Sequence, residues 1–233
     1  MAIICRKYNL LFIMTPRTAC TAIGELLRER FAGEFIPPES ILDSRGLIRV
    51  DKKHSTLSAL IRHNVLTIDE AKSLLKVAAV RNPFDSLVSL YFKQRSKYQP
   101  LLGDPASWVH GVPRYAEDMR YAQAHSFNRW VLRVTSRKLI KRLLGFHTSM
   151  FADHTRGVDV VIRYETIVAD LEEVFRRAGM ASEVEIPVVN RTEERANWDY
   201  RCYYSRISEL AVTIAYSRDL KMYGYDFDGV ASP

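Results

Sequence analysis

The chain has 233 residues, of which 47% are hydrophobic, and 34 lysines and arginines against 27 acidic residues give it a formal net charge of +7. This length fits a single domain, residues 1–233, and the hydrophobic content excludes a disordered chain. The charge favours an anionic partner but does not choose among a phosphorylated cofactor, an acidic glycan, a membrane surface and nucleic acid.

The cysteines and the apolar runs indicate the cellular compartment of the protein and whether it spans a membrane. Cys5, Cys20 and Cys202 are odd in number, lie far apart and lack C-x-x-C spacing, so we expect neither a disulfide framework nor a metal site. A reducing cytoplasm fits these cysteines best. The apolar run at residues 10–14 is too short for a signal-peptide core or a membrane-spanning helix, so we expect a soluble protein without a membrane span.

Residues 10–31 contain the first candidate site. Leu10–Met14 is a short apolar run, typical of a strand buried on both faces of a parallel sheet, and helical periodicity begins at Thr18. The backbone N–H groups of the turn therefore lie at a helix N-terminus, where they favour an anion. Arg17 adds a positive charge, and Thr18 and Thr21 add hydroxyl donors. The turn is predicted to bind a phosphate group.

The turn reads Pro16-Arg17-Thr18-Ala19-Cys20-Thr21. It lacks the two glycines and the lysine of a Walker A motif, which weakens the case for a nucleoside triphosphatase. It resembles the 5′-phosphosulfate loop of sulfotransferases, Pro-Lys-[Thr/Ser]-Gly-[Thr/Ser]-Thr, and especially the Pro-Lys-Val-Ala-Cys-Thr version of the chondroitin-type carbohydrate enzymes. Arginine replaces the usual lysine, and Ala-Cys replaces the commoner Gly-Thr. The alternative for this stretch alone is an ordinary Thr-Pro turn that opens a core helix.

A second candidate lies between a predicted strand, residues 47–50, and a helix predicted over residues 57–61. Ser55 or Thr56 can cap this helix, which leaves His54 just before it at the edge of a cleft. A histidine with a pKa near neutrality suits a general base. The Lys-His-[Ser/Thr] context also resembles that of related sulfotransferases, where this histidine is the proposed base towards the acceptor hydroxyl. The alternative is a solvated loop histidine among lysines.

A third candidate follows the second buried strand, which is predicted over Lys76–Val80 after a helix with a capping box at Thr67–Glu70. The segment RNPFDSLVSLY, residues 81–91, is similar to the 3′-phosphate motif of sulfotransferases, Arg-[Asp/Asn]-Pro-[Tyr/Phe]-x-x-x-x-Ser-x-[Tyr/Phe]. Arg81 leaves a strand end and Ser89 lies two turns along the next helix, so both can reach one phosphate. The alternative, an ordinary strand-to-helix turn, does not explain two such motifs in the right order.

The middle of the chain is rich in proline and glycine from Lys93 to Arg114, which predicts a long surface loop. A helix is then expected over about residues 115–144. Its basic face is either a solvated surface or a groove for an acidic acceptor chain. This face consists of Arg133, Arg137, Lys138, Lys141 and Arg142.

The third predicted strand is Val158–Ile162, and the Arg-Tyr-Glu that follows it is similar to the sulfotransferase segment [Ile/Leu]-Arg-Tyr-Glu-[Asp]-Leu. We expect Tyr164 and Glu165 to have a structural role in holding the phosphate loop. In the tail, Arg191 is a further candidate contact to the 3′-phosphate, because basic residues of late loops have this role in the family.

The resemblance extends from residue 10 to residue 227. It implies a P-loop-like α/β fold, in which a parallel β-sheet carries helices on both faces and the strand ends at Met14 and Val80 lie beside one crevice. It also implies an enzyme, a sulfotransferase whose donor is 3′-phosphoadenosine 5′-phosphosulfate (PAPS) and whose product is adenosine 3′,5′-bisphosphate. The acceptor is a hydroxyl group of a carbohydrate or another small molecule.

The implied reaction is a metal-free in-line transfer. The donor is held by the loop Pro16–Thr21 together with Arg81, Ser89 and Arg191. Arg17 meets the negative charge that grows on the leaving phosphate oxygen, and His54 takes the proton of the acceptor.

Two functions of other classes stay open. A P-loop nucleotide kinase would need a triphosphate cradle and magnesium ligands. A nucleic-acid-binding protein is supported by the net charge alone, because the sequence contains no recognition motif, and we expect no nucleic-acid partner. The identity of the acceptor and the oligomeric state do not follow from the sequence.

Overall fold

The computed structural model describes residues 2–44, 48–52, 54–112, 114–146, 148–180 and 199–231. The chain divides into two compact units that interleave along the sequence. The sheet unit comprises Met1–Arg81 and Phe151–Asn190, and the helical unit comprises Asn82–Met150 and Arg191–Pro233.

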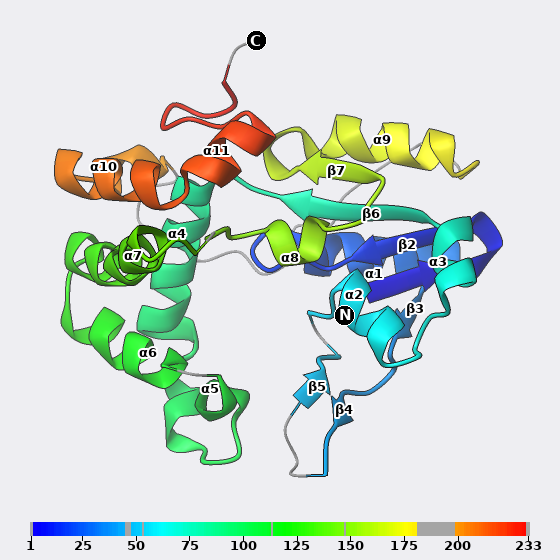
Figure 1. The fold of residues 1–233 in the computed structure, drawn as a ribbon, viewed down its shortest axis with the longest axis horizontal. Helices are drawn as coiled ribbons and strands as arrows, with labels where there is room; N and C mark the ends of the chain where they lie inside the picture. Colours follow the sequence, from blue (N-terminus) through cyan, green and yellow to red (C-terminus); the bar gives the residue numbers. More distant parts are fainter. Residues whose placement is uncertain are drawn as a thin grey trace. The chain divides into compact units, whose positions relative to one another are not determined.

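The sheet unit contains a five-stranded sheet in the order β3-β1-β2-β6-β7 (Figure 1). Its strands are β1 (Ala2–Cys5), β2 (Leu10–Ile13), β3 (Glu34–Ile36), β6 (Leu75–Val80) and β7 (Val160–Arg163). β2, β6 and β7 are parallel neighbours, which confirms the three predicted strands, whereas β1 runs antiparallel to both β2 and β3. The purely parallel sheet of the prediction therefore needs one correction. The short apolar β1 escapes pattern reading because a tight turn, η1 (Arg6–Tyr8), joins it to β2.

Helices cover both faces of this sheet, as expected for the α/β fold. The other elements of the unit are α1 (Cys20–Phe31), α2 (Leu57–Arg62), α3 (Ile68–Ser73), α8 (Ala152–Thr155), η4 (Tyr164–Thr166), α9 (Ile167–Arg177) and a small hairpin of β4 (Ile41–Leu42) and β5 (Ile48–Val50). On one face α1 and α9 bury Phe12, and on the other α2 and α3 bury Leu11. Because side chains alternate across a strand, the all-apolar β2 is buried on both sides.

Two helix starts in the sheet unit follow the predicted caps. Thr56 Oγ1 accepts a hydrogen bond from the backbone N–H of Ala59 at 3.2 Å and so begins α2. At the start of α3, Glu70 N–H donates to Thr67 Oγ1 at 3.1 Å and Thr67 N–H donates to Glu70 Oε2 at 2.9 Å, which completes the capping box. The cap at Thr56 leaves His54 two residues before the cap and three before the first residue of α2, where the sequence places it.

The helical unit is built around two neighbouring helices, α7 and α10. Its elements are α4 (Pro83–Phe92), η2 (Lys93–Lys97), η3 (Gln99–Gly103), α5 (Trp108–Gly111), α6 (Tyr115–Ala124), α7 (Phe127–Leu143), η5 (Tyr200–Tyr203), α10 (Arg206–Ala215) and α11 (Ser217–Tyr223). The single helix predicted over about residues 115–144 is interrupted at His125 and Ser126, where the chain is extended. Among the described residues, no helix combines the length and the apolar character that a membrane span requires.

The prediction of a long loop over residues 93–114 is wrong, because most of this stretch forms short helical turns. Contacts within the helical unit stabilise these turns. Trp130 Nε1 donates to Gln94 Oε1 at 2.9 Å, and the rings of Tyr98 and Trp108 meet edge to face with centroids 5.6 Å apart. Proline and glycine predict the breaks between the turns but not the aromatic contacts that order them.

The basic face of α7 is largely occupied within the helical unit. Arg137 lies 2.8 Å and Arg133 lies 3.5 Å from carboxylate oxygens of Asp118. The Lys138 amine lies 5.0 Å from the centre of the Tyr216 ring, and burial lowers the pKa of this amine. Since these three cations have partners inside the unit, we do not propose a groove for an acidic acceptor chain on this face.

Candidate active site

A tight loop follows β2 and leads into α1. Arg17 and Ala19 have left-handed backbone conformations, with φ of 71° and 56°, which residues with a Cβ adopt at an energetic cost and which recur in anion-binding loops. The Thr18 hydroxyl donates to the carbonyl oxygen of Thr15 at 2.9 Å inside the loop. Ala19 is the N-cap of α1 and offers no side-chain cap. The side chain at this position therefore does not compete with an anion for the N–H groups at the start of α1.

The predicted phosphate ligands of this loop differ in whether the backbone N–H or the side chain can contact a ligand. Thr18 is fully buried and its hydroxyl stabilises the loop, so its backbone N–H is the group that remains for a ligand. Cys20 is also buried, while Pro16 has no N–H and shapes the turn. Arg17 and Thr21 are half-buried, so their side chains are accessible.

The loop has the donors that a phosphate group needs. It combines backbone N–H groups at an uncapped helix N-terminus with the guanidinium of Arg17. In addition, Thr15 Oγ1 is buried without a hydrogen-bond partner within the part of the chain that the structure describes. Leaving such a group unsatisfied costs about 1–3 kcal/mol, so this hydroxyl would gain from a water or a ligand in the loop. The residues present therefore fit a phosphate group.

Arg81 joins the second motif to this loop. The carboxyl ends of β2 and β6 are neighbours, with Ile13 opposite Ala78, so the residue that follows β6 lies beside the loop. Arg81 Nη1 donates to the carbonyl oxygen of Arg17 at 3.3 Å. Its guanidinium also lies over the ring of Tyr164, 4.0 Å from the centroid. This contact agrees with the structural role expected of Tyr164.

His54 lies at the same end of β2. Its Nδ1 is 3.0 Å from the carbonyl oxygen of Met14, and because a carbonyl only accepts, Nδ1 carries the proton and Nε2 carries the lone pair of the neutral ring. Burial lowers the pKa of His54 from the usual 6.5 to about 4, although the bond to Met14 favours the protonated form. The near-neutral pKa expected from the sequence is therefore too high, because partial burial disfavours the charged ring.

His154, on α8, is a residue of this site that sequence reasoning missed. Its ring meets that of His54 edge to face, with centroids 6.5 Å apart. Burial lowers the pKa of His154, and a hydrogen bond with the backbone of His54 opposes this effect. Its Nε2 is buried and makes no hydrogen bond to the described residues. The sequence carries no signal for this pair, because the two histidines are far apart in the chain.

The remaining predicted ligands are placed differently. Ser89 is a buried residue of α4 in the helical unit, and Arg191 lies outside the described residues. Asn82, next to Arg81 in the motif, caps α4 by accepting from Phe84 N–H at 3.0 Å, and its Nδ2 donates to the carbonyl oxygen of Asp226 at 2.8 Å. The asparagine of the motif thus ties the C-terminal segment to α4.

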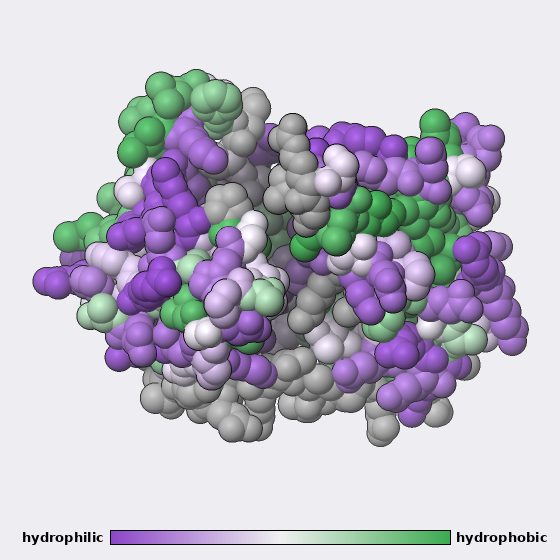
Figure 2. Space-filling model, turned by 90° about the horizontal axis from the view of Figure 1, so that it is seen from below, coloured by the Kyte–Doolittle hydropathy of each residue, from purple (hydrophilic) through white to green (hydrophobic). Residues whose placement is uncertain are grey.

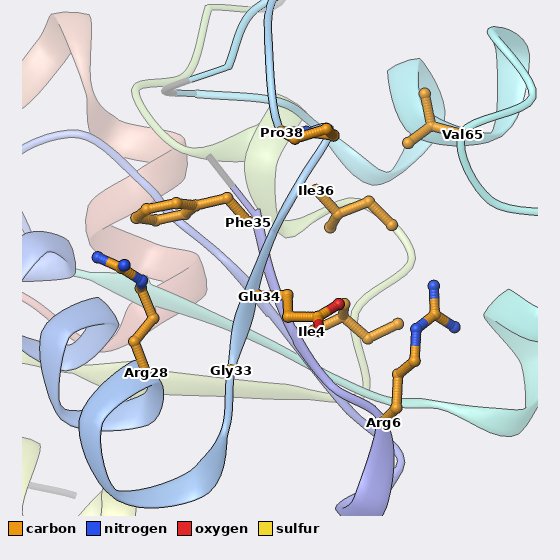
Figure 3. Close-up of a pocket in the computed structure, with 9 residues that line it drawn as sticks. All are labelled: Ile4, Arg6, Arg28, Gly33, Glu34, Phe35, Ile36, Pro38 and Val65. Atoms are coloured by element: carbon orange, nitrogen blue, oxygen red, sulfur yellow. The ribbon is translucent and has the colours of Figure 1, made fainter.

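A groove of about 580 Å³ lies elsewhere in the sheet unit, at the edge strand β3. It is lined by Ile4, Arg6, Arg28, Gly33, Glu34, Phe35, Ile36, Pro38 and Val65. Figure 3 shows Arg28 and Phe35 on one side of β3 and Glu34 and Arg6 on the other, and the Arg28 guanidinium lies 4.5 Å from the centre of the Phe35 ring. Neither the phosphate loop nor His54 lines this groove, so we do not assign it to the donor.

The profile of the sulfotransferase family matches residues 1–227. The chain therefore belongs to the sulfotransferase family, and it is an enzyme that transfers a sulfuryl group, as the motifs predict. Members of this family generally use PAPS as the donor. No curated protein and no solved structure matches the sequence.

Proposed function

We propose that this sulfotransferase moves the sulfuryl group of PAPS to a hydroxyl group of a carbohydrate by metal-free in-line transfer. The observation that supports the proposal is the hydrogen bond between Arg81 and the loop after β2, because a second arginine lies beside the loop that we propose for the 5′-phosphate. A donor with both a 5′-phosphate and a 3′-phosphate would bind the loop with the first and Arg81 with the second. The carbohydrate acceptor rests on the Ala-Cys version of the loop, which resembles that of the carbohydrate enzymes.

The residues of the loop have distinct proposed roles towards the donor. The N–H groups of Thr18, Ala19 and Cys20 and the hydroxyl of Thr21 hold the 5′-phosphate, and Pro16 shapes the turn that presents them. Arg81 pairs with the 3′-phosphate, which ordinary adenylates lack. Ser89 and Arg191 remain proposed ligands of the 3′-phosphate on the strength of the resemblance.

Bound PAPS supplies the sulfuryl group and a phosphate leaving group. His54 takes the proton of the acceptor hydroxyl at Nε2 while the acceptor oxygen bonds to sulfur, and the Met14 carbonyl keeps the proton on Nδ1. Arg17 stabilises the negative charge on the departing oxygen as the sulfur–oxygen bond to the phosphate breaks. This division of labour needs no metal ion.

We also propose that residues 1–233 act as one domain in a reducing cytoplasm. Cys5, Cys20 and Cys202 are all thiols, and such a compartment keeps them reduced.

Calorimetry with adenosine 3′,5′-bisphosphate, ADP and duplex DNA tests the proposed donor. Wild-type protein should bind the bisphosphate without magnesium, and more tightly than ADP. Tight ADP binding that requires magnesium would favour a nucleotide kinase. Steeply salt-dependent DNA binding without affinity for the bisphosphate would favour a nucleic-acid-binding protein.

Arg81→Ala should weaken binding of adenosine 3′,5′-bisphosphate by about 10- to 100-fold, because a hydrogen bond to a charged group contributes about 1.5–3 kcal/mol. Binding of adenosine 5′-phosphate should change much less, since it lacks the 3′-phosphate. Calorimetry on both ligands measures the difference. Arg28→Ala, an exposed arginine of the same unit, is the matched control and should bind both ligands as the wild type does. Equal losses for both ligands in Arg81→Ala would contradict the assignment.

His154 is proposed as a positioning residue for His54. His154→Ala should lower turnover by about 10- to 100-fold through misplacement of the base, with donor affinity unchanged. His154→Asn keeps a donor near the position of Nδ1 and should restore most of the activity, whereas His154→Gln places its amide near Nε2 and should not. Steady-state kinetics of the three variants decide. Wild-type turnover in all three variants would show that His154 has no role in the mechanism.

A further inference from the structure

The C-terminal end of α7 presents an exposed apolar surface, the α7 tip, which consists of Ile140, Leu143, Leu144 and Phe146. These side chains are 57%, 87%, 69% and 62% exposed. The helix closes with bonds from Phe146 N–H to the Lys141 carbonyl at 2.9 Å and from Gly145 N–H to the Arg142 carbonyl at 3.0 Å, and Gly145 has φ 81°. This is a Schellman ending, so the tip is an ordered feature of the backbone.

The tip belongs to a strongly basic part of the sequence. From Met119 to Ala152 the chain contains no aspartate or glutamate but seven lysines and arginines, which equals the net charge of the whole protein. Arg133, Arg137 and Lys138 have partners within the helical unit. Lys141, at the tip itself, is exposed.

Residues from α11 extend the basic surface beside the tip. Arg142 Nη1 donates to the Ile214 carbonyl at 2.8 Å and also bonds the hydroxyl of Ser217, which brings α11 next to the end of α7. Arg218 and Lys221 are exposed on α11. The acidic residue between them, Asp219, is buried and accepts from Met150 N–H at 2.8 Å. The rim of the tip is therefore positive.

Exposed apolar residues alone do not define a docking surface, because they are common on soluble proteins. Figure 2 shows hydrophobic areas among hydrophilic ones on the face that it draws. The tip differs from scattered residues because its four apolar residues are all exposed within one seven-residue segment, the last turn of α7 and its C-terminal cap, and have a basic rim.

The charge of the rim selects among partners. A symmetric dimer through this surface would place like charges opposite each other, which opposes association. Nucleic acid would meet the positive charge but would leave the apolar side chains in water. A bilayer with anionic lipids accommodates both, since its interface takes up leucine and phenylalanine and its headgroups attract lysine and arginine.

We propose that the α7 tip docks the protein on an anionic membrane surface. Leu143, Leu144 and Phe146 enter the interface between headgroups and acyl chains, and Lys141, Arg218 and Lys221 contact the anionic headgroups. This attachment is peripheral and does not involve a membrane span.

Vesicle flotation tests this proposal. Full-length protein is mixed with vesicles of phosphatidylcholine alone or with 30% phosphatidylglycerol added, at low and high salt. We expect binding to the anionic vesicles only, weakened by salt. Leu143→Ser/Leu144→Ser should lower the partition coefficient by about tenfold or more, and Phe146→Ser, a milder change, should lower it to a smaller extent. Ile68→Ser/Val168→Ser, which replaces two exposed aliphatic residues of the sheet unit, should bind as the wild type does.

Two results would overturn the proposal. One is equal partition of the wild type and the tip variants, with circular dichroism showing all of them folded. The other is a wild-type dimer by light scattering that becomes monomeric in Leu143→Ser/Leu144→Ser, without vesicle binding by either, which would assign the tip to contacts between copies of the chain.

Discussion

Replacement of His54 by alanine is expected to lower turnover by about 10²- to 10⁴-fold and to leave donor affinity almost unchanged. The reason is that the proposed role of His54 is proton removal from the acceptor. Its Nδ1 is held by the Met14 carbonyl at 3.0 Å, so the contribution of the residue lies at Nε2. Turnover with a model acceptor and calorimetry with adenosine 3′,5′-bisphosphate measure the two quantities separately.

The pH dependence of the wild type provides a second measurement of the same assignment. A base must be neutral to accept a proton, and burial lowers the pKa of His54 to about 4. Turnover should therefore be constant at neutral pH and fall as the pH drops through about 4. His54→Ala should lack this acidic limb. A limb that persists in the variant, with near-normal turnover, would assign the base to another group such as Glu165 or His154.

Acid stability must be followed in the same experiment. The pKa of His54 is about 4 in the folded chain and about 6.5 when the ring is solvated, so the unfolded state binds the proton first as the pH falls. The contribution of this residue to stability is therefore complete above pH 6.5 and is lost between pH 6.5 and 4. Thermal unfolding of the wild type and His54→Ala at each pH separates this loss from the catalytic limb, because the variant lacks the histidine contribution.

Replacement of Arg17 by alanine is expected to lower turnover by about 10²- to 10³-fold. Arg17 lies in the loop that we propose binds the 5′-phosphate, and its proposed contact is with charge that develops only as the leaving oxygen departs. The substrate complex lacks this charge, so donor affinity should fall much less than turnover. Single-turnover kinetics with saturating donor, together with calorimetry, distinguish the two effects.

Arg17→Lys is the matched control, because lysine is the residue that sulfotransferases usually have at this position. It should keep most of the activity, since a positive charge remains near the leaving oxygen. The left-handed backbone of residue 17, with φ 71°, costs arginine and lysine alike, because both side chains have a Cβ. If Arg17→Ala loses donor affinity alone and keeps its turnover, Arg17 holds the ground state and the transition-state role is wrong.

Local patterns in the sequence were sufficient to predict the strand, turn and helix that form the candidate site. The apolar run at β2 and the periodicity of α1 predicted the strand, the turn and the helix start. The capping box of α3 was equally readable, because its two hydrogen bonds join residues three apart. Features of this kind depend on neighbours in the chain, which a single sequence displays.

Only the tertiary structure decided the features that depend on distant segments. The antiparallel β1 and the ordered turns of residues 93–103 arise from pairing and aromatic contacts with other elements. The Thr18 hydroxyl, predicted as a phosphate ligand, instead donates a hydrogen bond to the Thr15 carbonyl within the loop.

The tautomer, the pKa and the neighbours of His54 also depend on distant segments of the chain. Its tautomer depends on the carbonyl of Met14, its low pKa depends on burial, and its neighbour His154 comes from a segment far along the chain. The sequence indicated His54, Arg17 and Arg81 as candidates for this site, but not His154. The fold decided the protonation of His54 and its partners, because both depend on which distant segments pack against the ring.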